Sequence, residues 1–245
     1  MKKNTLTNMW ESPYWHPAIT TDAVVFGYDT DDEKLYVLLI ERGGEPYKGS
    51  WALPGGFFRE DDQNAKECVR RELFEETHVD DIYLEELATF SEKDRDPRER
   101  VITIAFFALV VKNQFVIKGG DDARTAKWFA VDELPKLAFD HDKIISTAIE
   151  HLRQQIHFEP IGFKLLGKEF TMPQLQSIYI AILNPPQDSM KLRDRRNFAK
   201  KMLRLGYIKD TGKKLTGNAH RSPNIYTFDK EAYDNAKKLG MRLEF

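Results

Sequence analysis

Three glutamates near the middle of the first half of the chain have the spacing of a chemical site. Glu72, Glu75 and Glu76 lie three and four residues apart, so a helix would project all three from one face. Like charges at this spacing destabilise a helix by roughly a few tenths of a kcal/mol per pair, and Arg71 can offset only one of them. A hard cation would relieve the repulsion, and Mg²⁺ prefers carboxylate oxygens that it can bridge to substrate phosphates. The pattern therefore indicates magnesium-dependent chemistry at a phosphate, although a solvated glutamate-rich helix has the same pattern.

A second concentration of charge lies near the other end of the chain. Residues 157–245 hold 17 Lys and Arg against 9 Asp and Glu, whereas residues 1–156 hold 20 against 30. Such asymmetry indicates two parts with different partners, of which the basic part binds a polyanion. The candidate DNA-binding residues in the basic part are Arg195, Arg196, Asn197, Lys200, Lys201, Lys213, Lys214 and Arg221.

Length and composition limit the class of protein. The 245 residues are 41% hydrophobic and 12% aromatic, which suits one large or two modest folded domains and excludes a disordered chain. No run of residues is apolar over the length of a membrane span, and the two lysines at the start precede no apolar run, so we expect no secretory signal. The lone cysteine, Cys68, cannot form an internal disulfide, and we interpret it as a packing residue. These features predict a cytoplasmic protein.

The elements that must position the glutamates alternate between strand and helix. Residues 18–28 and 34–42 are β-branched and aromatic runs around a polar turn, which predicts a hairpin. Asn64, with Glu67 three residues on, predicts the start of the acidic helix. The apolar run 101–111 predicts a strand buried on both faces, residues 114–131 predict two strands around a Gly-Gly-Asp turn, and residues 140–156 predict a closing helix. We therefore expect residues 1–157 to form an α+β or α/β sandwich.

The basic part has a different pattern. Residues 158–170 contain two glycines and a proline without a clear period, so we predict the domain boundary there. Thr171 then caps a helix with a helical apolar period, and a second helix begins near Asp194 and ends at Gly206. A strand, a basic loop and a strand follow. This order predicts a winged helix-turn-helix over residues 171–245, with the helix 194–205 in the major groove and Lys213, Lys214, His220 and Arg221 of the wing on phosphates or in the minor groove.

The stretch GGFFREDDQNAKECVRRELFEETHV resembles the Nudix box, G-x5-E-x7-R-E-U-x-E-E-x-G-U, where U is aliphatic. The sequence departs from that box where Gln63 replaces the first glutamate, where Gly56 lies one residue too far upstream, and where His78 replaces the late glycine. Glu60, Asp61 and Asp62 are candidate substitutes for the missing glutamate. The resemblance implies a Nudix-like fold, Mg²⁺ held by Glu72, Glu75 and Glu76, and catalytic roles for Glu75, Glu76 and Arg71.

A wider resemblance covers nearly the whole chain. DRDPRERV at 94–101, AKWFAVDELP and the following FDH are similar to the effector domain of the NrtR family of transcriptional regulators and of its sugar-responsive relatives. These proteins join a Nudix-like domain to a C-terminal winged helix. The resemblance implies that Arg95, Asp96, Arg98 and Arg100 contact a nucleotide or sugar effector such as ADP-ribose, whereas Phe139 and Asp140 are better explained as a core residue and a helix cap.

We therefore expect a ligand-responsive DNA-binding regulator that binds a pseudo-palindromic operator as a homodimer, because two recognition helices require two-fold symmetry. The main alternative is a Mg²⁺-dependent ADP-ribose pyrophosphatase with an accessory winged helix. A third, weaker alternative is a Nudix enzyme that acts on nucleic-acid ends.

Overall fold

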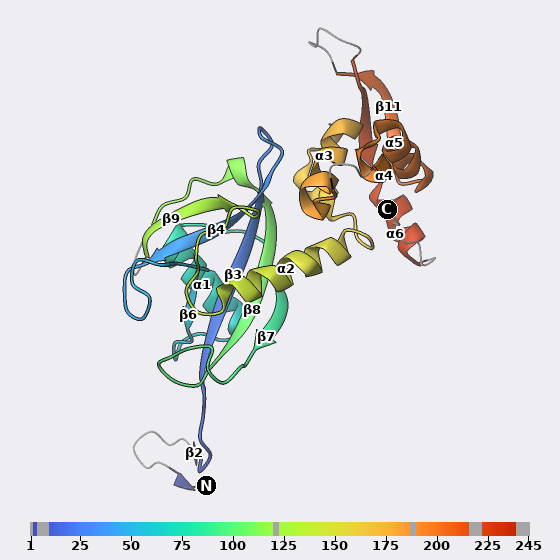
Figure 1. The fold of residues 1–245 in the computed structure, drawn as a ribbon. Coiled ribbons are helices and arrows are strands. Elements are labelled where there is room, and N and C mark those ends of the chain that lie inside the picture. The colour runs from blue at the N-terminus through green and yellow to red at the C-terminus, as the bar shows by residue number, and fades with distance from the viewer. Residues whose placement is uncertain (1, 4–9, 120–122, 187–189, 216–221, 239–245) are drawn as a thin grey trace.

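The structure, a computed structural model, describes residues 2–3, 10–119, 123–186, 190–215 and 222–238. A sheet-containing part and a smaller helical part lie side by side, with one long helix, α2 (His141–Gln155), running from the first towards the second (Figure 1). No helix in the described ranges is both long enough and apolar enough to cross a membrane.

A mixed sheet forms the centre of the first part. The long strand β3 (Ala18–Tyr28) pairs with β4 (Leu35–Arg42) as the predicted hairpin, and it pairs in parallel with β8 (Val101–Val111), the strand predicted from the apolar run. The strand order is β5-β4-β3-β8-β7, with β6 beside β3 and β9 beside β4. The remaining strands are β5 (Trp51–Ala52), β6 (Gly55–Phe57), β7 (Glu85–Phe90), β9 (Ala123–Ala130) and a separate N-terminal pair, β1 (Lys2–Lys3) and β2 (Trp10–Glu11).

Two helices cover opposite faces of this sheet. The acidic helix α1 (Ala65–Thr77) begins where it was predicted, because the Asn64 side chain accepts a hydrogen bond from the Glu67 amide at 3.1 Å. The core on the α1 side contains Val69 and Leu73, and the core on the other side contains Ile144 and Leu152 of α2. The predicted sandwich is confirmed.

The prediction of a strand before the Gly-Gly-Asp turn is wrong. Residues 115–119 form no strand, and a short 3₁₀ turn, η1 (Lys112–Gln114), precedes them. Phe115 and Ile117 instead pack against the core beneath α1. On the side of β4 away from β3, only β9 is paired with it among the described residues. The apolar residues of segment 115–119 therefore cover the core instead of pairing in the sheet. Residues 120–122 lie outside the described residues.

The second part is the predicted winged helix. Its first helix begins with a reciprocal capping box between Thr171 and Gln174, and its recognition helix begins where Asp194 accepts a hydrogen bond from the Asn197 amide at 2.7 Å. Gly206 ends that helix at φ +80°, a conformation that favours glycine. The elements are β10 (Glu169–Thr171), α3 (Met172–Leu183), α4 (Met190–Arg193), α5 (Arg195–Arg204), β11 (Ile208–Lys214), β12 (Asn224–Phe228) and α6 (Lys230–Lys238).

The segment between the two parts is packed rather than open. The 3₁₀ helix η2 (Ile161–Leu165) buries Ile161 and Leu165, and β10 pairs with β12 in the wing sheet. One hydrophobic core continues from the α2 face of the large sheet through η2 to α3 and α5. The boundary at 158–170 and the exact domain limits stay predictions.

Candidate functional site

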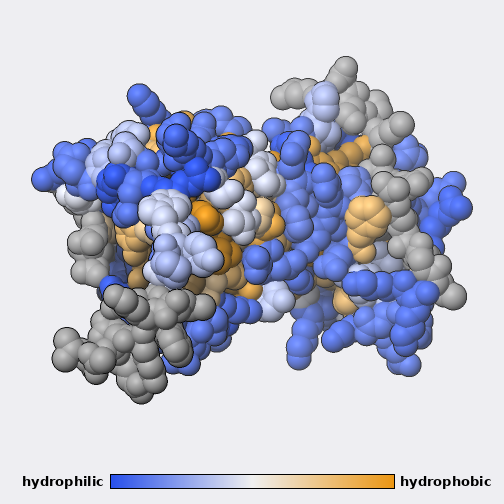
Figure 2. All heavy atoms as spheres, turned by 90° about the horizontal axis from the view of Figure 1, so that it is seen from below, coloured by the Kyte–Doolittle hydropathy of each residue, from blue (hydrophilic) through white to orange (hydrophobic). Residues whose placement is uncertain are grey.

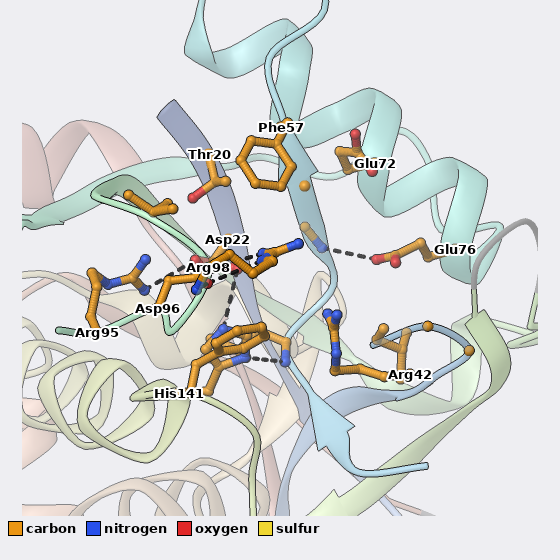
Figure 3. A pocket seen from close by; sticks show the side chains of 18 of the residues that line it. Thr20, Asp22, Arg42, Phe57, Glu72, Glu76, Arg95, Asp96, Arg98 and His141 are labelled. Carbon is orange, nitrogen blue, oxygen red and sulfur yellow. Dashed lines mark hydrogen bonds and ion pairs between the residues drawn. The ribbon is translucent and has the colours of Figure 1, made fainter. Parts of the chain in front are cut away.

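A cavity of about 400 Å³ opens at the end of the large sheet, a volume typical of small-ligand sites. Its walls come from segments far apart in the sequence: the start of β3, the end of β4, β6, α1, the loop 91–100 and the first residue of α2. The labelled side chains converge on one space in Figure 3. They are Thr20, Asp22, Arg42, Phe57, Glu72, Glu76, Arg95, Asp96, Arg98 and His141.

Two of the three predicted glutamates line this cavity. Glu76 is buried and accepts a hydrogen bond from the Gly55 amide at 2.9 Å, and burial raises the pKa of Glu76 to about 8. Glu72 lies against Gly56, where a Cβ atom would come within 2.6 Å of the Glu72 carboxyl carbon. Gly56 therefore permits the close approach of β6 to the acidic face of α1.

The third glutamate has different partners. Glu75 accepts two hydrogen bonds from the guanidinium of Arg59, both at 2.7 Å, and lies 3.4 Å from Nη1 of Arg71, which also pairs with Glu72. In the described ranges no three His, Cys, Asp or Glu side chains are grouped so that they could hold a metal ion. In this arrangement Arg59 and Arg71 pair with Glu75 and Glu72, whereas Glu76 accepts only from the Gly55 amide among the described residues. The metal and catalytic roles of Glu72, Glu75, Glu76 and Arg71 stay predictions.

The departures from the Nudix box are accommodated locally. Asp62 accepts hydrogen bonds from Arg71 Nε at 3.0 Å and Nη2 at 2.7 Å, and Arg71 holds the pKa of Asp62 well below its usual range. Of the three candidate substitutes for the missing glutamate, Asp62 thus pairs with the arginine of the box. His78 ends α1 in the left-handed region at φ +58°, with its amide donating to Phe74 O. The helix end therefore closes without glycine.

The structure brings three of the four predicted effector residues to the cavity. Arg95 is buried and donates to both carboxylate oxygens of Asp140, at 3.1 and 2.7 Å. Arg98 pairs in the same way with Asp96, at 3.0 and 2.7 Å. Arg100 lies elsewhere, in a separate depression beside Trp15, and does not line the cavity. Asp140 precedes α2 but makes no side-chain capping bond, since its carboxylate binds Arg95.

Aromatic rings surround the guanidinium of Arg98. Its Cζ lies 5.0 Å from the ring centroid of Phe57 and 5.6 Å from that of Phe139, within cation–π range. Tyr47 meets the edge of Phe139 at 4.9 Å between centroids. Phe139, interpreted from sequence as a core residue, therefore lines the cavity.

Sequence reasoning missed Arg42, the last residue of β4. Its Nε donates to Pro46 O at 2.9 Å and its Cζ lies 4.8 Å from the Phe139 centroid. Unlike Arg95 and Arg98, it forms no ion pair with any described residue. Burial lowers the pKa of Arg42, and the charge of Arg98 adds to that effect. A charged residue that ends an apolar strand was the only signal in the sequence.

A buried polar network that sequence reasoning also missed forms the floor of the cavity. The Leu53 amide donates to Nδ1 of His141 at 2.8 Å, so the neutral ring carries its proton on Nε2, which lies 3.6 Å from Asp22. Thr103 donates to Asp22 at 2.6 Å. Burial lowers the pKa of His141, which keeps the ring neutral.

The predicted DNA-binding residues lie mostly on the surface of the winged helix. Arg195, Arg196, Asn197 and Lys200 are exposed on α5, opposite the buried Phe198 and Met202, whereas Lys201 is half-buried. On the face drawn in Figure 2, hydrophilic residues predominate over the winged helix, on the right. On β11, Lys214 is exposed without an ion pair to the described residues, but Lys213 pairs with Glu169 at 2.7 Å. His220 and Arg221 lie outside the described residues.

Comparisons with known proteins agree with both parts. Residues 18–148 match the NUDIX domain family, and residues 162–228 match the NrtR DNA-binding winged helix domain. The chain is 31% identical over 233 residues to the "ADPR responsive transcriptional repressor NtrR" of Acinetobacter baylyi, with 94% of this chain and 89% of that protein covered. It is 44% identical over 132 residues to the ADP-ribose pyrophosphatase of Methanocaldococcus jannaschii, which covers 54% of this chain and 73% of that enzyme. Nudix hydrolases typically use a divalent metal.

Solved structures extend the likeness to the whole fold. Shewanella oneidensis NrtR in complex with a 27-mer DNA is 32% identical, covers 88% of this chain and 95% of that chain, and superposes with a TM-score of 0.66. The Nudix domain of the same protein in complex with ADP-ribose is 33% identical, covers 60% of this chain and 96% of that chain, and has a TM-score of 0.53. The chain therefore belongs to the NrtR family, in which a Nudix domain precedes a DNA-binding winged helix.

Proposed function

We propose that this protein is a transcriptional repressor whose Nudix domain binds ADP-ribose and whose winged helix binds operator DNA. Two relatives support the proposal by their ligands, one named for its response to ADP-ribose and one solved with DNA. The observation that carries the effector site is the position of Arg42: a half-buried guanidinium that has no ion-pair partner among the described residues and lies beside an aromatic ring in a cavity of about 400 Å³.

The chemistry of the cavity suits a nucleotide diphosphate sugar. Arg42, which forms no ion pair with a described residue, supplies a positive charge for the pyrophosphate, where a guanidinium can donate two parallel hydrogen bonds. Phe57 and Phe139 line the cavity with aromatic rings, next to the guanidinium groups that they contact, and these rings can pack against a base. The carboxylates of Asp96 and Glu72 are acceptors for ribose hydroxyls.

The DNA-binding half works through α5 and the wing. Arg195, Arg196 and Asn197 reach base edges in the major groove, where arginine recognises guanine and asparagine recognises adenine. Lys200, Lys201, Lys213, Lys214 and Arg221 contact phosphates. Two copies bind a pseudo-palindromic site, since two recognition helices need two-fold symmetry. A repressor acts at the chromosome, so the proposal places the protein in the cytoplasm.

The test uses the purified full chain and a duplex selected from a random-sequence pool. Saturating ADP-ribose should change the dissociation constant for that duplex by at least about fivefold, the lower end of typical allosteric coupling. AMP and ribose 5-phosphate, each carrying part of the ligand, should change it less. A DNA affinity that is the same with and without ADP-ribose would remove the effector proposal.

The second candidate function is Mg²⁺-dependent hydrolysis of ADP-ribose, which the 44% identity to a pyrophosphatase favours. If it applies, protein with Mg²⁺ should convert ADP-ribose to AMP and ribose 5-phosphate. Glu76→Gln should then slow the reaction by about a hundredfold, as the loss of a main electrostatic group does. The pairing of Glu75 with Arg59 favours the opposite result: ADP-ribose binding of equal affinity in Mg²⁺ and in EDTA, without turnover.

A further inference from the structure

The helix α2 has one end at the cavity and the other at the winged helix. Its first residue, His141, lines the cavity, and the residue before it, Asp140, is held by Arg95 of the cavity wall. At its other end Arg153 Nε donates to the backbone carbonyl of Ile182, in the last turn of α3, at 3.1 Å. Between these ends Ile144 and Leu152 are buried against the sheet. A movement at the cavity can therefore reach α3 through one continuous, packed helix.

Among the described residues, no amide of the segment after α3 donates to the carbonyl that Arg153 binds. An amide four residues on would normally donate to Ile182 O, but that residue is Pro186, and the residue three positions on is Pro185. Proline has no amide hydrogen, so neither bond can form. Arg153 satisfies this carbonyl from another element, and its positive charge lies at the negative end of the α3 dipole. Arg153 therefore supplies the hydrogen-bond donor that Pro185 and Pro186 cannot supply.

The same two prolines connect to the recognition helix. Arg193 Nη2 donates to Pro185 O at 2.9 Å and Arg193 Nε lies 3.3 Å from Pro186 O. Arg193 directly precedes Asp194, the N-cap of α5. In the core, Tyr179 of α3 also meets Phe198 of α5, with 5.6 Å between ring centroids. The end of α3 is therefore held by Arg153 on one side and tied to the start of the DNA-reading helix on the other.

The central strand supplies a second link. Thr20 and Asp22, near the start of β3, line the cavity, and Tyr28, at its end, is buried in the hydrophobic core that also contains Ile178 of α3. The helix α2 thus runs from the cavity to the end of α3, and β3 runs from the cavity into the core that it shares with α3.

We propose that Arg153 is a positioning residue that couples the effector cavity to the recognition helix, by holding the Ile182 carbonyl, which precedes the Pro185–Pro186 segment, at the end of α2. The proposal rests on the proposed function, because it needs both ligands. It predicts that without the Arg153 bond the protein still binds ADP-ribose and DNA, but that ADP-ribose no longer changes the affinity for DNA. The coupling is a ratio of affinities and is reciprocal between the two ligands.

The experiment compares Arg153→Met, which keeps an aliphatic stem but removes the donor, with Lys143→Met, which removes one positive charge from the same helix. Lys143 is exposed and pairs only with Glu92 at the surface among the described residues. The dissociation constants for ADP-ribose, for a selected duplex, and for that duplex with saturating ADP-ribose are measured on each full-length variant. Arg153→Lys, which can still donate to the carbonyl, serves as the conservative rescue.

Wild type and Lys143→Met should show the same ADP-ribose effect on DNA affinity, about fivefold or more. Arg153→Met should bind each ligand alone within about threefold of wild type, yet its ADP-ribose effect should fall below about twofold. Arg153→Lys should recover at least half of the lost effect. If Arg153→Met couples as wild type does, the proposal is wrong. If ADP-ribose does not change the DNA affinity of the wild type either, the proposed function itself is wrong, and with it the role of Arg153.

A measurement on unmodified protein covers the case in which Arg153→Met does not fold. ADP-ribose should change amide hydrogen exchange at residues 150–156 and 176–184. Exchange that changes only around the cavity would overturn the proposal, because no signal would then reach the end of α3.

Discussion

At the scale of single residues, the arginines of the cavity differ in what they already hold. Arg42 has no ion pair in the described structure, whereas Arg95 is 9% exposed and tied to Asp140 and Asp22. We expect Arg42→Ala to weaken ADP-ribose binding by about 1.5–3 kcal/mol, the value of a hydrogen bond to a charged group, with little change in melting temperature. Calorimetric titration and thermal unfolding measure the two effects. Arg100→Ala is the control and should alter neither, since Arg100 lies outside the cavity.

Arg95→Ala should give the opposite result. It leaves the carboxylates of Asp140 and Asp22 without their guanidinium partner, and breaking a buried pair costs about 3–5 kcal/mol. We therefore expect a large loss of unfolding free energy, measured by denaturant titration. If Arg95→Ala folds with wild-type stability and loses only ADP-ribose binding, Arg95 is a ligand residue rather than a structural one.

Glu76 should make stability depend on pH. Its pKa is raised by burial from 4.5 to about 8, so between these values the folded protein holds a proton that the unfolded chain has released. The contribution of Glu76 to the free energy of unfolding should therefore fall as pH rises from about 4.5 to about 8, by a few kcal/mol at about 1.4 per pKa unit. It is measured as the difference between wild type and Glu76→Gln, because His141, whose pKa burial lowers, contributes with the opposite sign. Glu76→Gln cannot ionise but keeps an acceptor for the Gly55 amide, so it should remove this slope in EDTA. An equal slope in both proteins would show that Glu76 is ionised in the folded state.

At the scale of elements, α5 and the wing should contribute differently to DNA affinity. Lys214 has no ion pair in the described structure, so Lys214→Ala should reduce the slope of log affinity against log salt by about 0.9, one phosphate contact. Lys213 is already paired with Glu169, so Lys213→Ala should change the slope less. Arg196→Ala should cost binding of a selected duplex about 1–3 kcal/mol more than binding of random duplex. Equal losses on both duplexes would make Arg196 a phosphate contact.

The helix ends show what local sequence determines. Asn64, Thr171 and Asp194 cap helices as their types predict, because the capping bond joins residues three positions apart. The segment 115–119 failed as a strand because its pairing depends on which edge of β4 is free, and that is decided by residues far away. Arg42 and the Asp22–His141 network were missed for the same reason: they meet only when β3, β4 and α2 are packed together.

At the scale of the whole molecule, the continuous hydrophobic core should make the two domains unfold together. The core cluster joins Val24 and Phe26 of the sheet, Leu152 of α2, and Ile178 of α3 without a break. A winged helix separated from the Nudix domain would expose the side of α3 that faces α2 and η2. This exposure costs a free energy of about 25 cal/mol per Å² of apolar surface. We therefore expect one unfolding transition, seen alike by calorimetry and by circular dichroism.

Ligand linkage tests this cooperativity. ADP-ribose at about a hundred times its dissociation constant should add about 2.7 kcal/mol to the unfolding free energy of the Nudix domain. If the domains unfold as one unit, the amides of α3 and α5 should gain the same protection against hydrogen exchange at their slowest positions as those of β3 and β8, although no residue of α3 or α5 lines the cavity. Two transitions, with only the first shifted by the ligand, would show that the core divides at η2. The effector signal would then have to cross a hinge rather than a shared core.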